Sequence, residues 1–142
     1  MITRANILLA GLALLLLTGC GNDNKRVDYI PYVYVNQTLN LTNVQYAPLR
    51  QDRGYIYLNG GLRGIIVVRQ SANQYLAFER NCTFQPYDSC ATVKVDASSL
   101  FMQDPCCGSQ FDLQGDVSGG PAIYPLKQYA TSLSGNMLYI TN

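Results

Sequence analysis

The chain has 142 residues, five cysteines and no histidine. Its ten Lys and Arg nearly balance nine Asp and Glu, so it lacks the basic excess with which proteins bind nucleic acid, and we expect no nucleic-acid partner. The length leaves room for one small domain beside a leader. The absence of histidine removes imidazole from every catalytic or metal-ligating role.

The first 19 residues are typical of a bacterial lipoprotein signal peptide. Arg4 provides a short positively charged start, and residues 5–17 are apolar with one exception, a stretch too short to span a bilayer comfortably. The stretch ends in a Leu-Thr-Gly-Cys motif, which the lipoprotein signal peptidase cleaves before a lipid-bearing cysteine. An ordinary signal peptide or a membrane anchor is the alternative. We therefore predict a signal peptide over residues 1–19 and lipidation of Cys20.

The predicted cleavage places the mature protein in the cell envelope, outside the cytoplasm. Loss of Arg4 leaves nine basic against nine acidic residues, so the mature chain is neutral and polybasic attachment to lipid is not expected. Membrane lipid is instead contacted through Cys20, and residues 20–27 form a polar tether. By resemblance to the sorting of enterobacterial lipoproteins, Gly21 rather than Asp after the cysteine favours the outer membrane over the inner one.

The remaining residues, 28–142, predict a small all-β domain, because no stretch after residue 20 shows a sustained helical period. Gly-, Asn- and Ser-containing turns are expected at 59–61, 71–73 and 134–136, and a tight connection at 115–120. Pro48 is expected to close the first strand region. Alternating or β-branched runs predict strands at 32–35, 38–41, 55–58, 64–69, 74–79, 110–113, 126–132 and 137–140.

Two loops between these strands carry the other four cysteines. Their sequences are Asn-Cys-Thr-Phe-Gln-Pro-Tyr at 81–87 and Asp-Pro-Cys-Cys-Gly-Ser at 104–109, followed by Gln-Phe-Asp-Leu and a Gly-Pro-Ala segment at 120–129. This order resembles the Rieske iron–sulfur domain, whose boxes C-T-H-x-G-C and C-P-C-H-G-S precede a Phe-Asp strand and a Gly-Pro-Ala segment. The resemblance is strongest over 55–142 and implies a Rieske-like fold of small antiparallel sheets.

The resemblance also indicates which residues occupy the former cluster-ligand positions: Cys82, Phe84, Asp104 and Cys107. A Rieske [2Fe–2S] cluster is held by two thiolates and two imidazoles, so one ligand in four is retained. We therefore expect no metal and no cofactor. The alternative is a 2Fe-2S cluster on an unorthodox ligand set of Cys82, Asp104 and Cys107. A four-cysteine zinc site is disfavoured because Cys106 and Cys107 are adjacent.

An even number of cysteines in an exported chain favours two disulfides, and counting alone permits three pairings. The resemblance implies that Cys90 and Cys106 form the family's loop-to-loop bridge, with Cys90 replacing the cysteine expected at Tyr87. Cys82 and Cys107 would then form a clasp where the cluster would lie. The competing pairing joins Cys82 to Cys106 and Cys90 to Cys107.

The sequence contains no catalytic constellation, so enzymatic activity is not expected. Ser109 lacks a histidine base, and aspartates in β-turn settings, such as Asp104, Asp112 and Asp116, are usually turn formers. We expect a membrane-anchored, non-enzymatic binding or structural module with an unknown protein partner. The alternative is a Rieske-type or disulfide-based electron-transfer protein.

Overall fold

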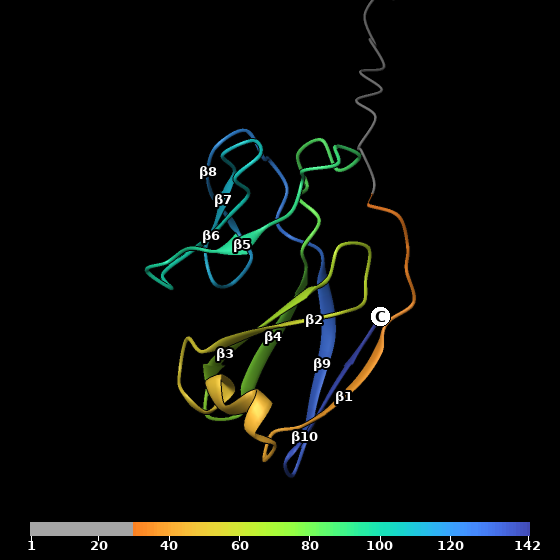
Figure 1. Ribbon diagram of the computed structural model, residues 1–142, viewed down its shortest axis with the longest axis vertical. Helices are drawn as coiled ribbons and strands as arrows, with labels where there is room; N and C mark the ends of the chain where they lie inside the picture. Colours follow the sequence, from red (N-terminus) through yellow and green to blue (C-terminus); the bar gives the residue numbers. More distant parts are fainter. Residues whose placement is uncertain (1–29) are drawn as a thin grey trace, which may run out of the picture.

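A computed structural model of the protein describes residues 30–142 (Figure 1). The signal peptide predicted at 1–19, the lipidation predicted at Cys20 and the tether predicted at 20–27 lie outside the described residues. Within residues 30–142, no helix has the length and apolar character needed to cross a membrane.

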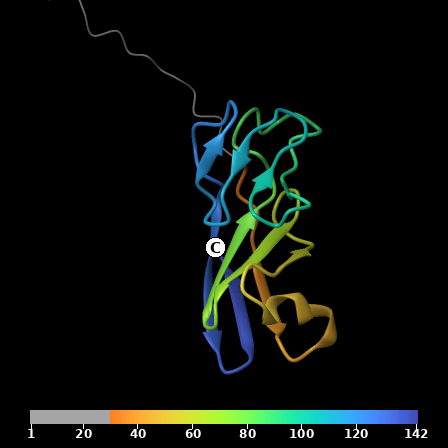
Figure 2. The same ribbon diagram turned by 90° about the vertical axis from the view of Figure 1, so that its left-hand side faces the viewer.

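The described chain forms two antiparallel sheets, which confirms the all-β prediction. Figures 1 and 2 show the smaller sheet and its loops at one end of the long axis, with the larger sheet extending to the other end. The smaller sheet has the order β5-β6-β7-β8, with strands Lys94–Val95, Met102–Gln103, Gln110–Phe111 and Val117–Gly119. The larger sheet has the order β1-β10-β9-β4-β3-β2, with strands Asn36–Asn40, Met137–Thr141, Gln128–Ser134, Gln74–Glu79, Ile65–Ser71 and Tyr55–Leu58.

Strand β3 lies between two hydrophobic cores. Its residues 65–68 are all β-branched and fully buried, as expected for a strand covered on both faces. Because successive side chains of a strand point to opposite faces, the pair Ile65 and Val67 and the pair Ile66 and Val68 enter different cores. The first pair packs with residues of the larger sheet, including Leu39, Leu138 and Ile140. The second packs under the smaller sheet with residues that include Cys82, Val95, Met102 and Phe111.

The predicted strand at 32–35 is wrong, because β1 begins only at Asn36. The side chain of Asn142 holds this segment instead of a strand partner. Its Oδ1 accepts a hydrogen bond from Val35 N at 3.0 Å, and its Nδ2 donates to Val33 O at 2.6 Å. The segment with alternating Tyr and Val therefore lies outside the sheet and is held in place by the Asn142 side chain.

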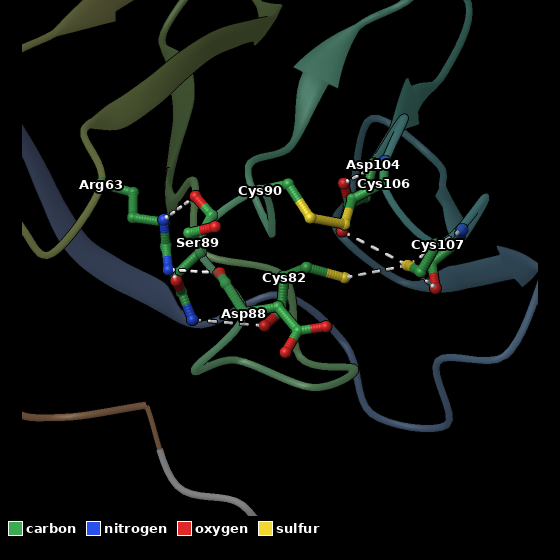
Figure 3. Close-up of a disulfide and its surroundings, with 10 residues drawn as sticks. Arg63, Cys82, Asp88, Ser89, Cys90, Asp104, Cys106 and Cys107 are labelled. Atoms are coloured by element: carbon green, nitrogen blue, oxygen red, sulfur yellow. Dashed lines mark hydrogen bonds between the residues drawn. A yellow bond between two sulfur atoms is a disulfide. The ribbon is translucent and has the colours of Figure 1, made fainter.

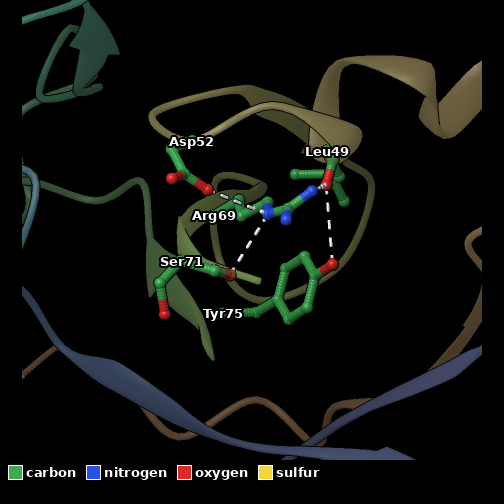
Figure 4. A network of polar contacts seen from close by, with 5 residues as sticks. All are labelled: Leu49, Asp52, Arg69, Ser71 and Tyr75. Carbon is green, nitrogen blue, oxygen red and sulfur yellow. Dashed lines mark hydrogen bonds and ion pairs between the residues drawn. The ribbon is translucent and has the colours of Figure 1, made fainter. Parts of the chain in front are cut away.

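The predicted role of Pro48 is also wrong: it lies inside a short 3-10 helix, η2 (Val44–Arg50), and closes no strand. The fixed φ of proline is compatible with this geometry, and the helix buries Leu49. Figure 4 shows how polar contacts attach it to the sheet. Arg69 Nη1 and the Tyr75 hydroxyl both donate to Leu49 O, at 3.3 and 3.5 Å, and Arg69 Nε pairs with Asp52 at 3.2 Å.

Other differences concern short elements near the loops. Strands β5 and β6 have two residues each, too few for an alternating pattern to appear. Strand β7 ends at Phe111 rather than 113, and β8 lies inside the predicted tight connection at 115–120. Strand β9 begins at Gln128 rather than 126, because Leu126 N donates to Gly115 O at 2.9 Å and Lys127 O accepts from Glu79 N at 2.8 Å.

Candidate functional site

Two loops meet at the end of the molecule that carries the smaller sheet (Figure 3). The first, residues 80–93, leads from β4 to β5, and the second, residues 104–109, joins β6 to β7. The second loop is closed by its own backbone: Asp104 N donates to Ser109 O at 2.9 Å, and Gly108 N donates to Asp104 O at 2.8 Å. Gly108 has a φ of 78°, which glycine adopts at little cost.

A third segment, between β8 and β9, contacts both loops. Ala122 N donates to Ser109 Oγ at 3.1 Å, and Thr83 Oγ1 donates to Tyr124 O at 2.7 Å. The two cysteine-bearing loops are thus connected through a segment distant in sequence from the first of them. The Gly-Pro-Ala motif noted in the sequence belongs to this segment.

A disulfide joins the two loops directly. Cys90 and Cys106 are bonded, with Cα atoms 5.6 Å apart and a sequence separation of 16. The bridge implied by the family resemblance is therefore confirmed. The competing pairing of Cys82 with Cys106 and Cys90 with Cys107 is wrong, since Cys90 and Cys106 are each other's partners.

Arg63, from the turn between β2 and β3, holds the first loop through three hydrogen bonds. Its Nη1 donates to Ser89 O at 2.7 Å, its Nη2 donates to Asp88 O at 2.5 Å, and its Nε donates to Asn81 Oδ1 (Figure 3). These bonds link residues 18 to 26 positions apart in sequence. No local pattern indicates such contacts, and the sequence analysis did not find Arg63.

The site itself consists of Cys82, Asp104 and Cys107, one ligand atom from each lying within 4.8 Å of the others. The two Sγ atoms are 3.8 Å apart, and the Cys107 thiol donates to Asp104 Oδ2 at 3.3 Å (Figure 3). Cys82 and Asp104 are fully buried, whereas Cys107 is partly exposed. Three of the four positions that the family resemblance indicated as cluster-ligand positions are therefore brought together.

The predicted second disulfide is absent, because Cys82 and Cys107 are both free cysteines. Their sulfur separation of 3.8 Å is well beyond the bond length of about 2.05 Å. The Cys107 thiol instead makes polar contacts with Asp104 and with Ser109, whose Oγ lies 3.0 Å from the sulfur. The structure thus corrects the predicted clasp to a pair of thiols beside a carboxylate.

Backbone amides orient this carboxylate and one of the sulfurs. Cys106 N donates to Asp104 Oδ1 at 2.9 Å, which leaves Oδ2 directed at Cys107. Ser109 N donates to Cys107 Sγ at 3.4 Å. Ser109 is itself fully buried, so this residue, rejected above as a nucleophile, contributes both an amide and a hydroxyl to the surroundings of Cys107.

Burial raises the pKa of the Cys82 thiol to about 12, and the hydrogen bond to Asp104 and the charges of Cys107 and Asp104 act in the same direction. A backbone bond from Phe84 lowers this pKa by a smaller amount. In the part of the chain that the structure describes, the ion pair found is Arg69 with Asp52, beside η2, so Asp104 has no ion-pair partner there.

The other candidate residues lie apart from this group. Phe84 packs, partly buried, against the core that includes Cys82. Asp112 Oδ1 accepts hydrogen bonds from Gln114 N at 2.9 Å and Asp116 N at 3.0 Å, which is the geometry of a turn former. No second carboxylate joins Asp104 in the three-residue group among residues 30–142.

No family model and no curated protein matches the sequence. Among solved structures, the chain is similar to the cyanobacterial plasma membrane Rieske protein PetC3 from Synechocystis PCC 6803, with 30% identity, a TM-score of 0.53, and coverage of 63% of this chain and 88% of that chain. It also resembles the ferredoxin of carbazole 1,9a-dioxygenase from Nocardioides aromaticivorans IC177, with 19% identity, a TM-score of 0.45, and coverage of 63% and 86%. The first of these similarities, together with the two cysteine-bearing loops and the bridge between them, shows that the chain belongs to the Rieske protein family.

Proposed function

We propose that this protein is a lipid-anchored redox module of the cell envelope, in which the thiols of Cys82 and Cys107 take the place of the family's iron–sulfur cluster. The observation that carries the proposal is the 3.8 Å separation of the two sulfur atoms. The thiols lie in two loops already joined by Cys90–Cys106, so they are held close without being bonded to each other.

The donor set does not fit a Rieske cluster. Such a cluster needs two thiolates and two imidazoles, but the chain has no histidine and Phe84 offers no donor atom. The remaining donors of Cys82, Asp104 and Cys107 gather within 4.8 Å of one another, whereas ligands of two bridged irons are spread across both metal ions. This mismatch supports a module that works without the cluster.

The differing exposure of the thiols suits thiol–disulfide exchange. The Cys107 thiolate, which is partly exposed, attacks a disulfide of a partner protein and releases the first partner thiolate. The Cys82 thiol then attacks the Cys107 sulfur, gives its proton to the partner thiolate already released, and expels the second partner thiolate. Two electrons and two protons pass to the partner, and the Sγ atoms close from 3.8 Å to about 2.05 Å.

The anchor is part of the proposal. The lipoprotein motif ending at Cys20 supports attachment to membrane lipid on the extracytoplasmic side, with Gly21 favouring the outer membrane. PetC3 is described as a plasma membrane protein, which supports a membrane-associated location for this chain as well. A thiol pair also suits a compartment in which disulfides form and persist.

The test is a redox titration of the full-length protein extracted from membranes. Samples equilibrated with glutathione buffers are alkylated, and mass spectrometry counts the free thiols. We expect the free thiols of Cys82 and Cys107 to be lost together, with one midpoint potential between about −270 and −120 mV, the range of thiol oxidoreductases. In the Cys107→Ser variant, the single remaining thiol of Cys82 should stay free at every redox potential of the titration. Thiols that stay free across this range would contradict the proposal.

A second candidate function is a non-enzymatic binding module, favoured by apolar surface beside the site. Ile123 is 72% exposed and Tyr124 43% exposed, and Thr83 attaches this segment to the first loop. The same titration separates the candidates, because Cys82 and Cys107 of a module that only binds a partner would stay free across the range of thiol oxidoreductases. About two irons per chain with a visible charge-transfer spectrum would instead indicate a cluster.

A further inference from the structure

We infer that the reduced site binds a single soft divalent cation, with Zn²⁺ as the best fit, through Cys82 Sγ, Cys107 Sγ and a carboxylate oxygen of Asp104. This goes beyond the proposed function, because it requires only that the thiols be reduced, not that they exchange with a partner. The three donor atoms already lie within 4.8 Å of one another.

The distances agree with a tetrahedral ion. Two thiolates at about 2.3 Å from zinc in tetrahedral geometry have sulfurs about 3.8 Å apart, and the observed separation is 3.8 Å. A thiolate and a carboxylate oxygen on the same ion are separated by about 3.5 Å, compared with 3.3 Å between Cys107 Sγ and Asp104 Oδ2. Two of the three donor separations thus match those around one ion, and the third, between Cys82 Sγ and the Asp104 carboxylate, is within 4.8 Å and closes when the ion binds.

Asp104 is placed to act as the third donor. It is fully buried and has no ion-pair partner in residues 30–142, where the ion pair found lies beside η2. Zn²⁺ replaces the two thiol protons, so the net charge of the site stays the same while the carboxylate gains a direct contact with a cation. Its Oδ1 is held by Cys106 N at 2.9 Å, so Oδ2 stays directed at the sulfurs. Such amide contacts are the usual way in which a protein orients a metal ligand.

The donor types define the class of ion. Two thiolates select Zn²⁺ or Fe²⁺ over Mg²⁺ and Ca²⁺, which prefer oxygen. On binding, the two thiols release their protons to solvent, and the carboxylate completes a set of three protein ligands. Three ligands leave a fourth position for water, and the partial exposure of Cys107 puts that position on the solvent side.

The experiment uses full-length protein in detergent, treated with a chelator and shown to contain two free thiols, so that Cys90–Cys106 is intact. Zn²⁺ is titrated in competition with a chromophoric chelator, and Co²⁺ is added separately as a spectroscopic probe. We expect one Zn²⁺ per chain, and Co²⁺ absorption bands of a tetrahedral thiolate site. Asp104→Asn should weaken Zn²⁺ binding by more than the roughly 10- to 100-fold that loss of a supporting residue costs.

Two further variants make the result specific. Cys107→Ser removes a partly exposed sulfur and should abolish the thiolate bands of Co²⁺, while Asp116→Asn removes an exposed carboxylate outside the site and should change nothing. Equal Zn²⁺ binding by the wild type and Cys107→Ser, or no binding by protein with two free thiols, would overturn the inference. If Cys82 and Cys107 are oxidised and reduced together in the presence of a chelator but the reduced protein binds no Zn²⁺, this inference alone is contradicted. If the protein binds Zn²⁺ but Cys82 and Cys107 are not oxidised in the redox titration, the proposed function alone is contradicted.

Discussion

Gly120 lies so close to Ser109 that a Cβ at position 120 would be 2.6 Å from Ser109 Cα and 2.6 Å from Gly108 O. Both are backbone atoms, so no side-chain rotation relieves the contact. The segment between β8 and β9 therefore rests directly on the loop that carries Asp104 and Cys107. Only glycine at position 120 allows this approach.

We expect Gly120→Ala to destabilise the protein more than Gly108→Ala. The two glycines have nearly equal φ angles, 80° and 78°, but a Cβ at Gly108 meets nothing within 4 Å. Gly108→Ala should cost about 1–2 kcal/mol of unfolding free energy through its left-handed backbone alone. Gly120→Ala should cost this plus the displacement of Ser109, and denaturant unfolding measures both. Equal losses would show that the close approach contributes nothing.

Removal of the Cys90–Cys106 bridge should lower the free energy of unfolding by about 3 kcal/mol, as expected for a closed loop of this length. The bridge spans a separation of 16 residues. The variant is Cys90→Ser with Cys106→Ser, and Cys107→Ser is the control because it removes a cysteine but no disulfide. Urea unfolding curves under non-reducing conditions provide the measurement. A double variant as stable as the wild type would contradict the expected constraint.

Stability should decline at alkaline pH because of Tyr129. Burial, and then the hydrogen bond that the Tyr129 hydroxyl donates to Glu79 Oε2 at 2.7 Å, raise the pKa of Tyr129 above its usual value. A raised pKa in the folded state stabilises the protein below the unfolded value of about 10, and this contribution is lost as the pH rises further. The free energy of unfolding should therefore fall above about pH 10.

The variant Tyr129→Phe checks the assignment. At pH 7 it should be less stable by about 1 kcal/mol through loss of the hydrogen bond, and above pH 10 the difference from the wild type should shrink. Tyr139→Phe, which alters a partly exposed tyrosine on β10, is the control. Parallel stability curves for the wild type and Tyr129→Phe would assign the alkaline decline to other groups.

We propose that Cys20 carries the lipid, and we therefore expect the Cys20→Ala variant to be either uncleaved or soluble. Acyl chains contribute about 0.8 kcal/mol per buried methylene, so several chains on one cysteine hold a protein on a membrane. Detergent partitioning and intact mass of the two forms provide the measurement. A Cys20→Ala protein that still partitions into detergent with the normal mature mass would exclude Cys20 as the lipid attachment site.

The sequence predicted the parts of the fold that depend on local pattern. The β-branched run at 65–68 and the alternation at 74–79 became β3 and β4, and the order of the loop motifs led to the Rieske family. Within the site, it identified Cys82, Asp104 and Cys107 as positions that meet.

Long-range contacts could not be predicted in this way. The tyrosine-rich run at 32–35 alternates like a strand, but Asn142, over a hundred positions away, holds it outside the sheet. The hydrogen bonds of Arg63 to the first loop also join residues far apart in sequence, so no local pattern predicts them. The state of the two thiols depends on a separation in space between residues 25 positions apart, which a family resemblance does not specify when the cluster ligands differ.

The position of β3 between two cores has a consequence for the evolution of this scaffold. Ile65 and Val67 belong to the core of the larger sheet, while Ile66 and Val68 belong to the core beneath the loops. Cys82 belongs to the second core, and Phe84 and Cys107 pack against it, so substitutions at these positions leave the packing of the larger sheet in place. Selection can therefore change the side chains of the site at one pole of the molecule without rebuilding the sheet that supports them.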